Sequence, residues 1–103
     1  MDVAETRVET GLEYTEGEPV RVRVRQRGRR YDLLDDGRPV ELAGHPGGWR
    51  ERAAAVVEAH DLNVNRAGVV FVPAVEGGID RDWLARRVAE TSIALYDALL
   101  ELE

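Results

Sequence analysis

Hydrophobic and polar residues alternate with a period of two over Val20–Gln26, which predicts a β-strand with valines on one face and arginines on the other. Gly28 then suits a tight turn, because glycine readily adopts the positive φ that such turns require. The chain returns as a second strand over Arg29–Leu34. Leu12–Thr15 predicts a shorter strand before this hairpin, and Gly11 separates that strand from the first ten residues.

The segments on either side of the hairpin are less regular. The first ten residues fit two structures, since Asp2 and Glu5 suit a capping box at the start of a helix, whereas the threonines and Val8 suit a strand. After the hairpin, Asp35-Asp36-Gly37 is a second turn signal. Pro39–Leu42 briefly resumes the alternation, which predicts an edge strand because proline cannot donate a ladder hydrogen bond.

Two later segments show the period of amphipathic helices. Trp49–His60 places its main apolar side chains on one face. The second helix starts at the N-cap Asp80 and runs for about 22 residues, near 33 Å, with an unusually wide apolar stripe. Between the helices we expect two short strands, Leu62–Val64 and Val69–Val72. The latter is apolar on both faces and is expected to end at Pro73.

These elements predict a single α+β domain over residues 1–103, with an antiparallel sheet of about five strands and two helices packed on its valine face. A chain of this length supports one modest core, because two smaller cores would not be stable unaided. The residues expected in that core are Val22, Val24, Leu33, Val56, Val57, Val69, Phe71, Leu84, Val88, Leu95 and Leu99.

The order of elements after Tyr31 resembles a known group of domains. The strand Tyr31–Leu34 ends in Asp35-Asp36-Gly37, and a helix, a hairpin over Leu62–Val72 and a long final helix follow. This order is similar to that of small bacterial and phage-associated α+β domains of unknown function. The resemblance implies an α+β fold and assigns no site residues.

Charge is segregated along the chain. The net charge is −6 and all 14 basic residues are arginine, yet six of them fall in one short segment without an acid. Such an island suggests a nucleic-acid or polyanion surface made of Arg21, Arg23, Arg25, Arg27, Arg29 and Arg30. The alternative is a solvated strand face whose arginines pair with glutamates of the N-terminal segment. We favour this alternative, because the overall negative field repels phosphate and only Tyr31 lies nearby for base stacking.

No group of residues forms a coherent catalytic or metal-binding set in the sequence. Cysteine is absent, which excludes thiolate ligands and disulfides. Asp35 and Asp36 are interpreted as turn residues, and an enzyme would require them to converge with His45 or His60 on one pocket. The one serine, Ser92, lies inside the last helix. We therefore predict no enzymatic activity, no cofactor and no metal.

The wide stripe of the last helix and the two-sided strand near residue 70 leave open whether they are buried within one chain or between chains. We expect a contact with a second subunit, made by Val70, Val72, Tyr96 and Leu100. The leading prediction is a non-catalytic protein-interaction module, homodimeric or with an unknown protein partner, and nucleic-acid binding is the alternative. Without a signal-peptide core or an apolar run of ~20 residues, we expect a cytoplasmic protein with no membrane partner.

Overall fold

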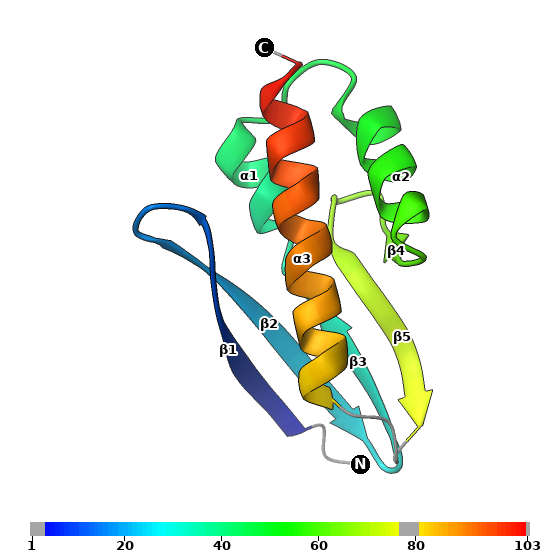
Figure 1. Cartoon of the computed structure of the whole chain (residues 1–103). Helices are drawn as coiled ribbons and strands as arrows, with labels where there is room; N and C mark the ends of the chain where they lie inside the picture. Colours follow the sequence, from blue (N-terminus) through cyan, green and yellow to red (C-terminus); the bar gives the residue numbers. More distant parts are fainter. Residues whose placement is uncertain (1–3, 77–80, 103) are drawn as a thin grey trace.

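A five-stranded antiparallel sheet forms the base of the fold in the computed structural model, which describes residues 4–76 and 81–102 (Figure 1). Its strands, in spatial order, are β1 (Ala4–Thr15), β2 (Glu18–Arg27), β3 (Arg30–Leu34), β5 (Val70–Glu76) and β4 (Asn63–Val64). Every neighbouring pair is antiparallel, so the predicted α+β class with an antiparallel sheet is confirmed.

Three helices accompany the sheet: α1 (Arg38–Ala43), α2 (Trp49–Ala59) and α3 (Arg81–Leu100). The long helix α3 crosses one face of the sheet, and α1 and α2 lie on either side of its C-terminal half (Figure 1). α2 and α3 correspond to the two predicted helices, and Asp80, the predicted N-cap of the second, lies outside the described residues. None of the helices in the described residues lies on the opposite face of the sheet.

The described residues of the first ten, 4–10, belong to a strand rather than a helix, and Asp2, the predicted start of such a helix, lies outside the described residues. β1 pairs with β2 in a register that places Val8 opposite Val22 and Thr6 opposite Val24, so its alternation matches the valine face of β2. Gly11 does not end the strand, contrary to the prediction. It lies at φ 75° inside a β-bulge between Glu9 and Glu13, where glycine tolerates the left-handed backbone.

The core lies between the valine face of the sheet and α3. Most of the predicted core residues are buried there: Val22, Val24, Leu33, Val57, Leu84, Val88, Leu95 and Leu99. Val56 is half-buried and packs against this core. Val69 and Phe71 were expected in the core, but the pairing of Leu34 with Phe71 puts them on the face away from α3. Val70 takes their place and is fully buried.

Two segments differ from the predicted strands. Pro39–Leu42 lies in α1, because Asp36 and Gly37 both adopt left-handed conformations that turn the chain into a helix with Pro39 in its first turn. Pro73 does not end β5, which continues to Glu76. A register shift between the β3 residues Tyr31 and Leu33 falls opposite this proline, and such an irregularity accommodates a residue that lacks a backbone N–H.

Candidate interaction surface

The face of the sheet opposite α3 carries the arginines of β2, as predicted. Arg21, Arg23 and Arg25 alternate with the buried residues Val22 and Val24. Arg21 is exposed, whereas the Arg23 and Arg25 side chains are about one third exposed, at 29% and 33%. We call this face, with its β1, β2, β3 and β5 side chains, the open face.

Carboxylates from neighbouring strands neutralise part of this arginine row. The Arg23 guanidinium lies 2.7 Å from Asp36 and 3.5 Å from Glu5, and the Arg25 guanidinium lies 3.7 Å from Asp32. The Glu5 contact is the predicted pairing with the acidic N-terminal segment. The open face therefore alternates cations with anions and is not a continuous positive surface.

The hairpin tip holds the remaining predicted arginines. Arg29 and Arg30 are exposed beside Gly28, and Arg30 lies opposite Glu76 in the β3–β5 register. Arg27 is the last residue of β2 and pairs with Arg30 along the backbone. The tip is thus separated from Arg21 by the ion-paired middle of β2.

Two shallow depressions lie on the open face and share Arg23. The first has a volume of about 390 Å³ and is lined by Arg23, Arg25, Asp32, Leu34, Asn65, Val69 and Phe71. The second, about 400 Å³, is lined by Arg7, Glu18, Pro19, Arg21, Arg23, Asp35, Asp36 and Arg38. Leu34 is only 6% exposed although it lies outside the main core. A small apolar patch on β3 and β5 therefore borders the charged rows of β1 and β2.

The predicted interface residues do not share one surface. Val70 is fully buried inside the chain and Val72 packs against the same core. The prediction that these two side chains face outward from the strand was therefore wrong. The half-buried Tyr96 ring meets the Tyr14 ring edge-on at 5.8 Å. Leu100 is 41% exposed at the C-terminal end of α3.

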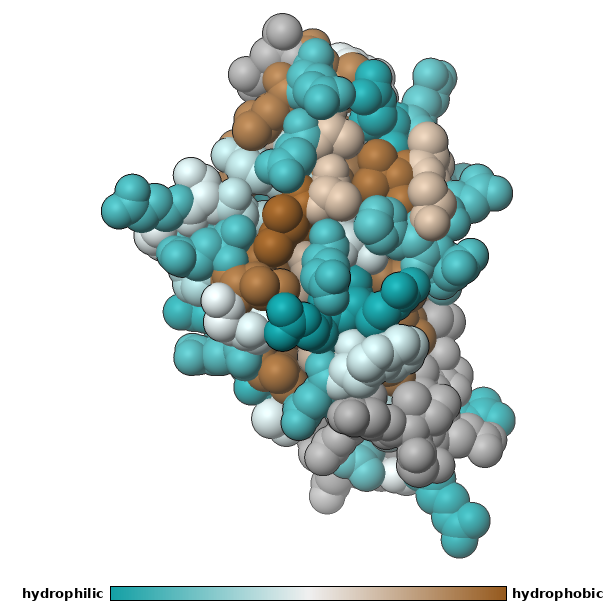
Figure 2. Space-filling view, in the orientation of Figure 1, coloured by the Kyte–Doolittle hydropathy of each residue, from teal (hydrophilic) through white to brown (hydrophobic). Residues whose placement is uncertain are grey.

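Most apolar side chains of α3 are buried within the chain. Its exposed large hydrophobic residues, Trp83 and Leu100, lie at opposite ends of the helix. On this side of the molecule, hydrophobic side chains are interspersed with hydrophilic ones (Figure 2). The exposed large hydrophobic side chains among the described residues of α3 are therefore not adjacent to each other.

A buried polar cluster that the sequence did not predict joins the turn between β3 and α1 to β5 and α3, around Asp35. One oxygen of this carboxylate accepts hydrogen bonds from the backbone N–H groups of Gly37, at 2.9 Å, and Val70, at 2.8 Å. The other oxygen lies 2.6 Å from the Ser92 hydroxyl, which also lies 2.8 Å from the Val88 carbonyl oxygen. Burial raises the pKa of Asp35 to about 6, and the three hydrogen bonds oppose this rise only in part.

The same cluster includes the Tyr14 hydroxyl. This group is buried beside Ser92 without a hydrogen bond of good geometry in the described part of the chain, and burial raises its pKa. Asp35 is therefore held by structural donors, and although it is only 2% exposed it borders the second depression on the open face. Its hydrogen bonds tie separate elements of the fold together.

The other candidate catalytic residues lie elsewhere. Asp36 is exposed and pairs with Arg23. His45 is exposed in the loop after α1, with its ring edge-on to Trp49 at 5.7 Å, and His60 caps the end of α2. Within residues 4–76 and 81–102, no group of three potential metal ligands comes together.

β1 is the end strand of the sheet and has no neighbour on its outer side in the described structure (Figure 1). It is 12 residues long, whereas the strand at the other end, β4, has two residues. Glu5, Arg7 and Glu9 project from β1 onto the open face, and Thr6 and Val8 project toward α3. The sequence alone leaves this segment ambiguous, although its charges already alternate with a period of two.

Comparisons of this chain with family models, curated proteins and solved structures gave no match. No helix in the described residues combines the length and the apolar character that a membrane crossing requires. The function is therefore inferred from the surfaces of the chain itself.

Proposed function

We propose that this chain is a non-catalytic protein-interaction module that works as a homodimer. The observation that carries the proposal is the long outer edge of β1, which has no neighbouring strand in the described structure. An edge strand presents a row of backbone N–H and C=O groups that another strand can pair with. Natural sheets protect such edges with short strands or bulges, and β4 is protected in this way by its length.

The bulge at Gly11 protects only the second half of β1. Residues Ala4–Glu9 pair with β2 without interruption, so the backbone along their outer edge is regular and could pair with a further strand. This half of the strand carries both acidic and basic side chains. An identical strand running in the opposite direction can place the acidic side chains of each copy opposite the basic side chains of the other. A second copy of the chain is therefore the proposed occupant.

Nucleic-acid binding is supported less well than homodimerisation. A phosphate backbone requires uncompensated cations, whereas Arg23 and Arg25 both pair with carboxylates on the open face. The glutamates of β1 lie on that same face. A phosphate backbone bound to the arginines would therefore also be repelled by these carboxylates.

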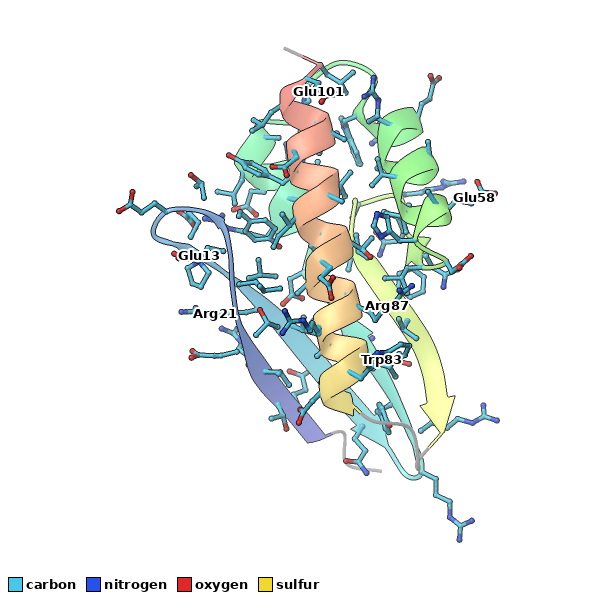
Figure 3. All side chains as sticks on the ribbon, in the orientation of Figure 1. Glu13, Arg21, Glu58, Trp83, Arg87 and Glu101 are labelled. Carbon is cyan, nitrogen blue, oxygen red and sulfur yellow. The ribbon has the colours of Figure 1, made fainter. Side chains whose placement is uncertain are left out.

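Sedimentation velocity over a range from low to high micromolar concentration tests the proposal. We expect a species of nearly twice the chain mass of 11.5 kDa to grow with concentration. Glu58→Gln is the control variant, because Glu58 is exposed on α2, on the opposite side of the molecule from β1 (Figure 3). A monomer at every concentration would contradict the proposal.

A further inference from the structure

Arg7 is a cation on β1 without an ion-pair partner in the described part of the chain. It is exposed, lies directly opposite Arg23 and shares a depression with Arg21 and Arg38. Like charges opposite each other on a sheet are destabilising, so an additional anion beside Arg7 would be favourable. Because β1 is the end strand of the described sheet, a further strand pairing with its outer edge would bring new side chains next to Arg7 on the open face.

Glu9 supplies the complementary charge. It lies two residues after Arg7 on the same face, is exposed, and likewise has no ion pair among the described residues. Glu5 differs, because its carboxylate already contacts Arg23. The outer edge of β1 thus presents a cation and an anion side by side, both without partners in the described chain.

We infer that two copies of the chain pair through antiparallel β1 strands, with the two-fold axis at Val8. This inference rests on the proposed homodimer and names its contact. In antiparallel strands, opposed residues project from the same face, and a two-fold axis makes the contacts reciprocal. With the axis at Val8, Arg7 of each copy lies opposite Glu9 of the other copy, and the two Val8 side chains meet on the α3 side.

The neighbouring registers are less favourable. An axis at Arg7 would place Arg7 opposite itself and Glu5 opposite Glu9, so that every charged pair repels. An axis at Thr6 would place Arg7 opposite Glu5, which is already engaged by Arg23, and would leave Glu9 without a partner from the straight part of β1. The Val8 axis is the register that satisfies both unpaired charges.

This pairing extends the sheet across both copies. Because the axis is perpendicular to the sheet, both α3 helices lie on one side and both open faces lie on the other. The small apolar patches of β3 and β5 then lie at opposite ends of a continuous charged surface.

A disulfide experiment tests the register, because the chain has no native cysteine. Residues directly opposite in an antiparallel pair have Cα atoms about 4.5–5.5 Å apart, which is within the range that a disulfide spans. We therefore expect Val8→Cys to give a reducible covalent dimer under mild oxidation. Thr6→Cys is the matched control, since it lies on the same face but opposite Thr10, and we expect it to remain uncross-linked.

The outcomes separate the inference from the proposed function. Cross-linking of Thr6→Cys in place of Val8→Cys would overturn the register. If the wild-type chain sediments as a dimer and neither variant cross-links, the homodimer stands and β1 pairing is refuted. If the wild-type chain is monomeric throughout, both proposals fail.

A charge exchange provides a second test. Arg7→Glu and Glu9→Arg each place like charges opposite each other twice per dimer, so we expect the dimer Kd to rise about tenfold or more. Mixing the two variants places glutamates opposite arginines at both contacts, and we expect the mixture to regain the dimer mass. Recovery on mixing excludes misfolding as the cause of weakened association. Variants that stay monomeric when mixed would overturn the inference.

Discussion

Replacement of Asp35 by asparagine removes a buried charge while keeping the shape of the side chain. The amide oxygen can still accept from the backbone N–H groups of Gly37 and Val70. The amide nitrogen can donate to the Ser92 hydroxyl, which then donates to the Val88 carbonyl oxygen already 2.8 Å away. The variant is therefore expected to keep the native hydrogen-bond network.

The magnitude of the effect follows from the pKa of Asp35, which rises from 3.8 to about 6 on folding because the carboxyl is buried. Each unit corresponds to about 1.4 kcal/mol, so the total is about 3 kcal/mol. A raised pKa means that the folded state holds its proton more tightly than the unfolded state. The stabilisation is complete below about pH 4 and is lost as the pH rises to about 6. Asparagine stays neutral and shows no such loss.

Urea denaturation of both chains between acid and neutral pH measures this difference. We expect the free energy of unfolding of Asp35→Asn, relative to wild type, to gain about 3 kcal/mol between pH 4 and pH 7. Asp36→Asn is the control, because it removes an adjacent exposed carboxylate and is expected to cost at most about 1 kcal/mol through its ion pair with Arg23. A difference between wild type and Asp35→Asn that does not change with pH would refute the reasoning.

Two further predictions concern the turns and the open face. Gly68→Ala is expected to lower the free energy of unfolding by about 2–4 kcal/mol, because its Cβ would lie 2.7 Å from Val40 at a φ of +84°. Gly44→Ala, at φ +77° with no neighbour within 4 Å, should cost about 1–2 kcal/mol in the same urea assay, and equal losses would contradict the steric argument. The carboxylates on the open face predict no salt-dependent binding of fluorescently labelled DNA or RNA. Salt-sensitive anisotropy changes abolished by Arg21→Glu with Arg23→Glu would show that this face binds nucleic acid.

Local pattern was enough to predict the elements that carry a clear period. The alternation of β2 predicts which of its side chains face the core, and the helical spacing of α2 and α3 predicts most of the buried residues. Val69–Val72 has no alternation, so its sequence does not indicate that Val70, rather than Phe71, faces the core. The pairing of β5 with β3 decides this, and it involves residues far apart in the chain.

The candidate surface was harder to predict for the same reason. Asp35 looks like part of an ordinary aspartate-glycine turn, and its burial depends on donors such as Ser92, 57 residues away. The short helix α1 has too few residues to show a helical period, so Pro39–Leu42 resembles an edge strand. The open edge of β1 becomes visible only once the spatial order of the strands is known.

The hydrogen bond between Asp35 and Ser92 also bears on how the chain folds as it is synthesised. α3 is the last of the described helices and strands to be made, yet it packs against the β1–β2 hairpin and against both shorter helices. Before it is made, the valine face of the hairpin lacks its cover and Asp35 lacks its serine donor. We therefore expect the earlier segments to lack a stable tertiary structure on the ribosome until α3 has emerged.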